Sequence, residues 1–339
     1  LQNGKEYFQC VADYLEQFDC VIANLEVAVT PRTRTMTPKS MHLRTDSRIL
    51  NIVKQLHVSC VVLSNNHVGD YDRKGLEDTV TALNKAGIPY VGVDGAKWRI
   101  EKHGTKISLT GYCCYSTNGS QYSKTYEGRG IPALREKTIV DQIEKDRKDG
   151  YFSVLSFHWG DEFSYYPNHK QITFARKLMQ KGHIMIYGHH THVMSGYEIQ
   201  GNSLAAYSLG NFYFDRCVSP KVKNFIVEQT DENRESYILE VAIEENQIID
   251  VRTTGIFGAE DEFRFIDNAK KVKEISDTIV NETDFTGLYQ DKRLKQISRL
   301  KAQKFAKHDF KWFMSKMNYY SIVSHMIMYL NKHRYNKAF

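Results

Sequence analysis

The chain has 339 residues and a net charge of +6, with 41% hydrophobic and 25% charged residues, a composition typical of a soluble globular protein. This composition excludes an intrinsically disordered chain, and the length exceeds one typical domain of about 100–200 residues. We therefore expect one large domain with an appendage. Much of the excess basic charge lies from Lys270 onward, so it belongs to the end of the chain rather than to a nucleic-acid-binding face.

Cysteine usage and hydropathy bear on the cellular compartment. The six cysteines, at positions 10, 20, 60, 113, 114 and 217, show no CxxC spacing, so we expect free thiols in a reducing environment. No leader peptide opens the sequence, and no apolar run reaches the roughly 18 residues of a membrane-spanning helix. We therefore expect a cytoplasmic protein that could bind a membrane peripherally. Because the sequence starts at Leu1 rather than at methionine, an upstream leader or anchor stays open.

The first part of the chain alternates helical and extended patterns. Apolar residues at helical spacing predict a helix over residues 6–18, and a short buried strand over residues 19–23 follows it. A loop rich in Thr, Pro and Arg, residues 30–39, could close over a substrate. A second helix ends near residue 56 and leads into a buried strand over residues 59–64.

The same alternation continues through the middle of the chain. Helices are predicted over residues 74–86, 134–148 and 167–182, and strands over residues 88–93, 107–112, 152–157 and 184–187. This rhythm is typical of a sheet with helices packed on its faces. The later segments read as antiparallel strands, which makes the sheet mixed: residues 198–199, 203–207, 224–229, 236–243 and 247–253.

The pattern changes again near residue 267, where basic and aromatic-rich helices begin. We therefore divide the chain into a main domain, residues 1–266, and a helical C-terminal region, residues 267–339. Two interpretations of this region stay open. We favour a helical pair that closes over the core, and the alternative is a surface that binds an anionic membrane.

Polar side chains with metal-binding chemistry follow four successive apolar strands. They are Asn24, Glu26, Asn65, Asn66, His67, His158, Glu162, His190 and His192. Ligand sites in sheets flanked by helices gather beyond the carboxyl ends of the strands, so these side chains are expected to meet. Imidazole and carboxylate ligands suit Mn, Fe, Zn or Ni better than Mg or Ca. The pattern therefore predicts a metal site, and a histidine-rich surface loop is the alternative.

Five motifs occur in an order that resembles the CapA family of bacterial capsule and poly-gamma-glutamate synthesis proteins, within the calcineurin-like metallophosphoesterase superfamily. The motifs are Asn24-Leu25-Glu26, Asn65-Asn66-His67, His158-Trp159-Gly160-Asp161-Glu162, Gly188-His189-His190-Thr191-His192-Val193 and Ser208-Leu209-Gly210-Asn211-Phe212. The resemblance covers residues 19–215 and the strands to about residue 257, and it excludes the region from residue 267. It implies an α/β fold, a four-layer α/β/β/α sandwich with mixed sheets, and a two-metal site.

The resemblance also implies a role for each matching side chain. Glu26 would be the bridging carboxylate, and the other metal ligands would be Asn66, His158, His190 and His192. His67 would be the catalytic acid that protonates a leaving oxygen. Supporting or substrate-contacting positions would be Asn24, Asn65, Glu162, His189 and Asn211.

Some of these residues have simpler interpretations. Asn24 and Asn65 could cap turns at strand ends, and His67 could be a buried histidine with satisfied hydrogen bonds. Residues 208–212 are expected to form a tight turn under the histidine loop, where Asn211 could donate a hydrogen bond to a ligand.

Two features depart from the family pattern. The first superfamily motif, an aspartate-containing strand end before the first helix, is absent, so we expect residues 1–266 to lack their first strand and one metal ligand. The bridging carboxylate is Glu26 rather than aspartate, and its longer side chain could change the spacing of the metals. Asp70 and Asp72 could face substrate, although we favour a helix-starting role for both.

The function implied by the resemblance is that of a metal-dependent hydrolase in capsule or surface-polymer biosynthesis. Two divalent ions, Mn, Fe or Zn, would activate water against a phosphoester or a related amide bond. The alternative is a non-catalytic accessory protein that retains the fold and binds polymer or a synthase. Expected partners are the surface polymer, a polysaccharide or poly-gamma-glutamate, or its precursor, and a membrane-bound polymer synthase complex. Nucleic acid is not expected, because no basic and aromatic interleaving marks the sheet.

Overall fold

The structure is a computed structural model. It describes residues 4–37, 39, 41–114, 130–214, 217–218, 226–227, 229–283 and 287–305, together with the single positions 314, 319, 322, 323, 326 and 329. The helices are α1 (Gly4–Tyr7), α2 (Gln9–Leu15), α3 (Ile49–Gln55), α4 (Asp72–Ala86), α6 (Glu136–Lys148), α7 (His169–Met179), α8 (Asp231–Arg234), α9 (Ala269–Val280) and α10 (Gly287–Phe305).

The strands form two principal sheets and three smaller groups. They are β1 (Ile22–Asn24), β2 (Ala28–Val29), β3 (Arg44–Thr45), β4 (Cys60–Val62), β5 (Tyr90–Val91), β6 (Trp98–Lys102), β7 (Thr105–Cys113), β8 (Phe152–His158), β9 (Ile184–His189), β10 (Tyr197–Gln200), β11 (Ser203–Ala206), β12 (Cys217–Val218), β13 (Ile226–Val227), β14 (Glu235–Glu244), β15 (Gln247–Gly258) and β16 (Phe263–Ile266). The principal sheets have the orders β1-β4-β5 and β10-β11-β9-β8-β7-β6.

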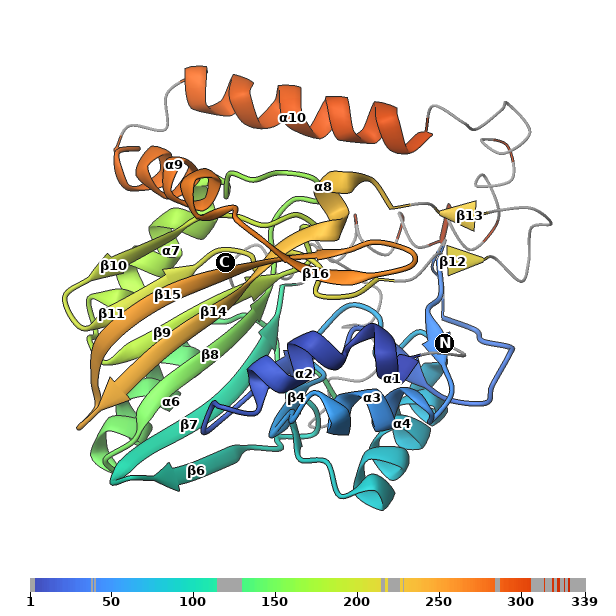
Figure 1. Ribbon diagram of the computed structural model, residues 1–339, viewed down its shortest axis with the longest axis horizontal. Helices are drawn as coiled ribbons and strands as arrows, with labels where there is room; N and C mark the ends of the chain where they lie inside the picture. The colour runs from blue at the N-terminus through green and yellow to red at the C-terminus, as the bar shows by residue number, and fades with distance from the viewer. Residues whose placement is uncertain are drawn as a thin grey trace.

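The molecule has four layers, with two sheets in the middle and helices on the outer face of each sheet (Figure 1). Alternate side chains of each strand contact the layers on its two sides. Val61 of β4 packs against α3 and α4 on the outer face of the three-stranded sheet, whereas Val62 packs inward on the six-stranded sheet. In β8, Val154 points into the space between the two sheets, and Leu155 packs under α6 and α7. Because successive side chains of a strand point to opposite faces, each sheet is covered on both sides, as its nearly continuous apolar sequence predicted.

The strands β14, β15 and β16 form a separate antiparallel sheet. Leu239 of β14 packs into the core between the sheets, and Ile238 packs with the cluster formed under α1 and α2. These two helices cross the front of the view in Figure 1. Their contacts with β15 and β16 include Val11 and Leu15 on Ile256.

The predicted mixed α/β fold with four layers is confirmed, and several details differ from the prediction. The first helix is interrupted at Phe8, which has a φ of −101° and a ψ of 4°. The strands that were not predicted are β2, β3, β6, β12 and β16. Strand β11 was expected to be antiparallel throughout, but it pairs in parallel with β9. The reason is the tight turn at Gly201, which folds β10 back as a hairpin and leaves β11 running in the direction of β9.

The two helices α9 and α10 pack on this domain. Val272, Ile275 and Ile279 of α9 join the core that contains Leu155 and the helices α6 and α7, and Tyr289 of α10 lies in the same core. The described positions beyond α10 include exposed large apolar residues: Met314, Tyr319, Ile322, Met326 and Tyr329. The boundary at residue 267 stays a prediction. Among the described residues, no helix combines the length and the apolar character needed to cross a membrane.

Candidate metal centre

Glu26 reaches the site from the turn that follows β1. The backbone there is held by Leu25, whose N–H donates to the carbonyl of Val62 on β4 (3.0 Å). The amide of Asn24 donates to Oε2 of Glu26 (3.1 Å), whereas Oε1 of Glu26 is buried and has no hydrogen-bond partner among the described residues. A single amide donor thus orients the carboxylate and leaves one oxygen available.

The turn after β4 is built by the side chain of Asn65. Its Oδ1 accepts the backbone N–H groups of His67 (3.1 Å) and Val68 (3.0 Å), and its amide donates to the carbonyl of Leu25 (2.9 Å). Asn65 therefore caps this turn and also ties it to the turn that carries Glu26. The result is that Asn66 points its Oδ1 at Nε2 of His158, 3.0 Å away.

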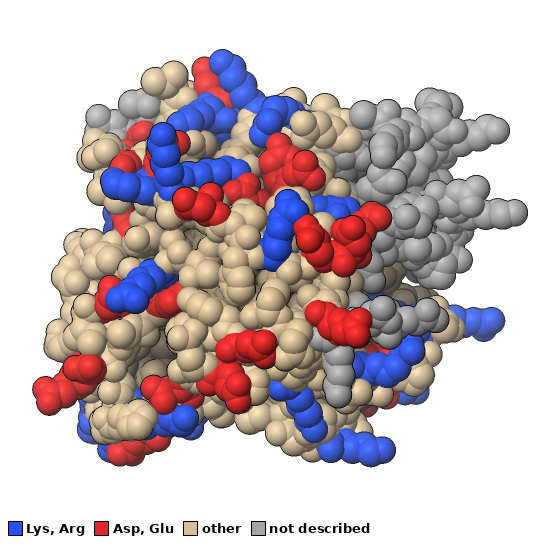
Figure 2. All heavy atoms as spheres, in the orientation of Figure 1, with Lys and Arg blue, Asp and Glu red and all other residues tan. Residues whose placement is uncertain are grey.

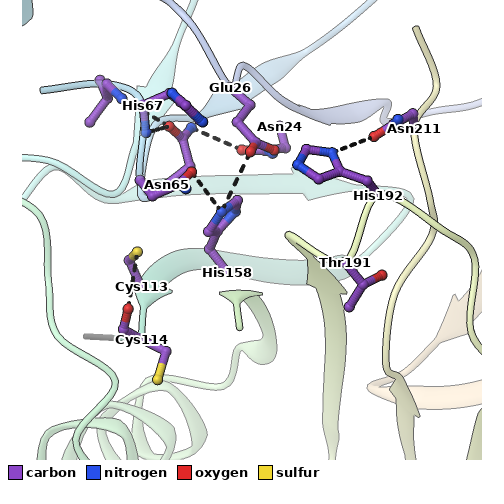
Figure 3. Close-up of polar contacts among 12 residues, drawn as sticks. Asn24, Glu26, Asn65, His67, Cys113, Cys114, His158, Thr191, His192 and Asn211 are labelled. Atoms are coloured by element: carbon purple, nitrogen blue, oxygen red, sulfur yellow. Dashed lines mark hydrogen bonds and ion pairs between the residues drawn. The ribbon is translucent and has the colours of Figure 1, made fainter. Parts of the chain in front are cut away.

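Three predicted ligands converge in the described part of the chain. Glu26, His158 and His190 each offer one ligand atom, and these atoms all lie within 4.8 Å of one another. Nε2 of His158 lies 3.6 Å from Oε1 of Glu26, and the rings of the two histidines are 4.9 Å apart at their centroids. Figure 3 shows Glu26 directly above His158, with Asn65 and His67 to one side. The parallel register of β8 and β9, with His158 opposite His189, brings the two histidine segments together.

The donor set fits a divalent cation. Nδ1 of His158 and Nδ1 of His190 are buried without a hydrogen-bond partner among the described residues, like Oε1 of Glu26. Buried polar groups are normally satisfied, so the unpartnered Oε1 of Glu26, which faces Nε2 of His158, favours an additional partner at this group. Ligand atoms at about 2.1 Å from one ion lie roughly 3 to 4 Å apart. The 3.6 Å between Nε2 of His158 and Oε1 of Glu26 lies in this range.

The electrostatics of the group agree with this fit. Burial raises the pKa of Glu26 to about 8 and lowers the pKa of His190 to about 4. Burial and the neighbouring His190 also lower the pKa of His158. Near neutral pH both imidazoles are therefore uncharged, with lone pairs available to a metal. A cation would favour ionisation of the Glu26 carboxyl.

His192 approaches from the side opposite His67 (Figure 3). Its Nδ1 pairs with Oδ1 of Asn211 (3.1 Å), and its backbone carbonyl accepts the amide of Asn233 (2.7 Å). We expected Asn211 to be a donor to a ligand, but its amide donates to the carbonyl of Asn233 and its oxygen faces the ring. His192 does not belong to the three-residue group.

Two further residues support the site: Lys39, which the sequence did not single out, and Asp70, for which we favoured a helix-starting role over a substrate-facing one. Asp70 is fully buried, and its carboxylate pairs with Nδ1 of His67 (2.7 Å) and with Nζ of Lys39 (2.6 Å). Burial by itself would raise the pKa of Asp70, but the two partners Lys39 and His67 hold this pKa below its ordinary value. Burial and the charge of Lys39 lower the pKa of His67. The helix-starting role expected of Asp70 is therefore wrong. The spacing of three residues from His67 was the available signal.

Lys39 ends the loop that was expected to close over a substrate. In the structure this loop is anchored beside the site, because Nζ of Lys39 also donates to the carbonyl of Asn66 (2.7 Å). Asp72, the first residue of α4, accepts the N–H of Met36 (2.9 Å) and the hydroxyl of Thr37 (2.8 Å). The loop thus contributes a buried cation to the surroundings of His67.

Other predicted positions lie at the margin of the group. His189 is outside the three-residue group, with its ring against that of Tyr187 at 5.3 Å. Glu162 is exposed, yet its charge acts on Glu26 and His190, which places it at the rim of the site. Trp159 donates its indole N–H to the carbonyl of Tyr207 (3.0 Å) and packs in the core.

Comparisons with known proteins give the family of the chain. The profile of the family described as "Bacterial capsule synthesis protein PGA_cap" matches residues 2–216. The capsule biosynthesis protein CapA of Bacillus anthracis is 30% identical over 228 residues, which covers 63% of this chain and 55% of that protein. The PGA biosynthesis protein CapA of Bacillus subtilis is 30% identical over 224 residues, covering 63% and 58%.

Similarities at lower sequence identity include one further relative and two solved structures. A probable polyglutamine synthesis accessory protein of Mycobacterium tuberculosis is 25% identical over 213 residues, covering 58% of this chain and 56% of that protein. The chain thus spans a little over half the length of the curated relatives that it matches. Among solved structures, the sulfate thiohydrolase SoxB of Thermus thermophilus has a TM-score of 0.42 and 14% identity, covering 69% of this chain and 38% of that one. The NAD nucleotidase of Haemophilus influenzae has a TM-score of 0.38 and 15% identity, covering 76% and 48%.

Proposed function

The chain belongs to the bacterial capsule synthesis protein PGA_cap family, and we propose that it is a metal-dependent hydrolase acting on a surface polymer or its precursor. The observation that supports this proposal most directly is the convergence of Glu26, His158 and His190, each with a buried atom that lacks a hydrogen-bond partner among the described residues. Family membership supplies the biological setting, capsule or poly-gamma-glutamate synthesis. The chemistry comes from the site.

Four side chains would hold the first ion: Glu26, Asn66, His158 and His190. Glu26 would also face a second ion, toward His192, which is the two-metal arrangement expected of the family. When bound, such ions supply Lewis-acid chemistry that polarises a phosphoryl or carbonyl oxygen and favours deprotonation of water near neutral pH. The nitrogen-rich donor set favours Mn, Fe or Zn over Mg or Ca.

The residues of the chain itself supply positioning and proton transfer. Asp70 binds Nδ1 of His67 and thereby leaves its Nε2 available to a substrate oxygen. In its imidazolium form, which the charge of Asp70 favours, His67 would give its Nε2 proton to the leaving group and return to the neutral ring with its Nδ1–H on Asp70. Lys39 keeps Asp70 ionised, so the orientation of His67 persists as substrate binds. Glu162, at the rim, would contact the polymer or a cationic group on it.

The test is metal content and hydrolysis measured on the same purified protein. We expect bound metal by elemental analysis and Mn-dependent cleavage of a chromogenic phosphodiester. His158→Ala and His190→Ala should each lower both metal content and turnover by at least about 100-fold, because each removes a ligand. His103→Ala, whose side chain is 81% exposed, is the matched control and should leave both unchanged. Equal behaviour of all three variants would refute the metal centre.

One observation favours a second candidate function, that of a non-catalytic accessory protein that binds polymer or a synthase. The tight group contains ligands for one ion, and His192 lies outside it. A protein of this kind would bind metal but show no hydrolysis of phosphodiesters or polymer fragments. It would retain affinity for poly-gamma-glutamate or polysaccharide in a pull-down that His158→Ala does not weaken.

A further inference from the structure

Helix α10 docks on the domain through one face. Tyr289, Arg293, Gln296 and Leu300 follow one another at helical spacing, and all four are buried. On the opposite face Leu294 is 59% exposed. Figure 2, in the orientation of Figure 1, shows basic side chains along the upper edge where α10 lies. The helix therefore has a definite inner face, whose partners identify what it contacts.

Those partners belong to the loop between β8 and α7, residues 159–168. The guanidinium of Arg293 donates to the carbonyl of Tyr166 (3.0 Å) and forms an ion pair with Asp161. Oε1 of Gln296 accepts the N–H of Tyr165 (3.0 Å). The hydroxyl of Tyr289 donates to the carbonyl of Pro167 (2.8 Å). Backbone groups of this loop thus find their hydrogen-bond partners on α10.

The same helix also contacts the loop that carries His192. Leu300 packs in one small cluster with Phe163 and Val193. Phe163 in turn donates its N–H to the carbonyl of Thr191 (2.8 Å), and its ring centroid lies 6.4 Å from that of His192. The two loops that follow β8 and β9 are therefore held together through Phe163, with Leu300 packed against it.

Backbone conformation shows why such support matters. Phe163 has a φ of +66° and His192 a φ of +58°, values in the left-handed region that cost energy for residues with a side chain. Conformations of this kind persist when the surrounding structure fixes them. At Phe163, the surroundings include the side chains of α10.

We propose that α10 is a positioning element of the metal centre, which holds the loop at residues 159–168 against the loop at residues 190–193. Arg293 and Leu300 are its main contacts. This inference rests on the proposed metal centre, and it goes beyond it because residues 287–305 lie outside the family match at residues 2–216. The affinity of the site for metal then depends on a part of the chain that does not belong to the matched family region.

Arg293→Met in the 339-residue chain tests this proposal. The change keeps an apolar stem but removes both the ion pair and the bond to Tyr166, and it leaves Asp161 with 48% of its side chain exposed to water. The control is Lys295→Met, which removes the same charge from the exposed face of the same helix. Mn²⁺ affinity is measured by calorimetry on metal-stripped protein, and thermal unfolding without metal is measured in parallel.

We expect Arg293→Met to weaken Mn²⁺ binding by about 10- to 100-fold, the range typical of supporting residues around a metal site. Lys295→Met should stay within about twofold of the wild type. Asp161→Asn, which keeps the helix and its packing intact, should show a smaller loss in the same direction. If wild-type protein binds Mn²⁺ and Arg293→Met binds it equally well, α10 is not a positioning element. If the wild type binds no Mn²⁺, the proposed metal centre itself is wrong and this inference is overturned with it.

Discussion

The two halves of the candidate site are supported in different ways. The half after β1 and β4 is held by contacts within residues 24–70. Asn65 bonds the N–H of His67 and the carbonyl of Leu25, and Asp70 pairs with His67 and with Lys39. The half after β8 and β9 is held by distant residues. Asn233 reaches His192 across 41 positions, and Arg293 reaches Asp161 across 132.

Because of this difference, we expect substitutions in the first half to lower the stability of the fold and substitutions in the second half to weaken metal binding. The contacts of Asp70 in the first half bury charge in the core, so their loss should mainly destabilise the fold. Long-range contacts such as that of Asn233 fix the orientation of a ligand-bearing loop, so their loss should mainly weaken the metal site. The predictions below test this contrast, starting with the largest effect.

Asp70→Ala should have the largest effect on stability. The change leaves the buried ammonium of Lys39 without its carboxylate, and the loss of one partner of a buried ion pair costs about 3–5 kcal/mol of unfolding free energy. The measurement is chemical denaturation of metal-free protein. Asp46→Ala, which breaks an exposed pair with Arg48, is the control and should change stability by less than about 1 kcal/mol. Similar losses of unfolding free energy in both variants would contradict the prediction that the buried contacts of Asp70 stabilise the fold.

The stability of metal-free protein should fall as the pH rises from 6.5 to 8. The pKa of Glu26 is about 8 in the folded chain against an ordinary value of 4.5, so the folded state holds the proton over this window and stability is lost as pH approaches 8. The loss is at most about 2 kcal/mol. His190, with its pKa lowered to about 4 from an ordinary 6.5, lowers stability only below pH 6.5.

Denaturation midpoints across this pH range provide the measurement. Glu26→Gln cannot ionise and should remove the dependence, which makes it the matched control. Saturating Mn²⁺ should reverse the trend in the wild type, because the metal binds the deprotonated carboxylate. A wild-type curve with the same slope as the Glu26→Gln curve would contradict the assignment of this titration to Glu26.

Asn233→Ala should have the smallest effect on stability and a clear effect on the metal. It removes the bond to the carbonyl of His192, worth about 1 kcal/mol, and frees the loop that orients the ring. Mn²⁺ affinity should fall by about tenfold. Asn51→Ala on the exposed face of α3 is the control for both measurements. A loss of stability without a loss of affinity would show that Asn233 supports the core instead.

The same contrast explains how much the sequence could reveal. Asn24, Asn65 and His67 lie next to the ends of buried strands, and local turn chemistry places them wherever those strands are recognised. The order of the ligand motifs along alternating strands and helices was therefore sufficient to predict the meeting of Glu26, His158 and His190, and the four layers were predicted from the resemblance to the family. The pairing of β11 and the added strand β6 depend on which edges are free, and local pattern does not contain that information.

The sequence by itself determined the fold class, the family and the set of metal-competent side chains, because periodicity and short motifs are local properties of the chain. Only the tertiary structure decided that Lys39 and Asp70 support His67, that Asn233 orients His192, and that Arg293 holds the neighbouring loop. Most of these contacts join residues far apart in the sequence. The contact of Asp70 with His67 is local, but it replaces the helix-starting role that the sequence suggested for Asp70. The physical reason is that a buried charge or an orphan backbone group takes whichever partner the folded chain brings within reach.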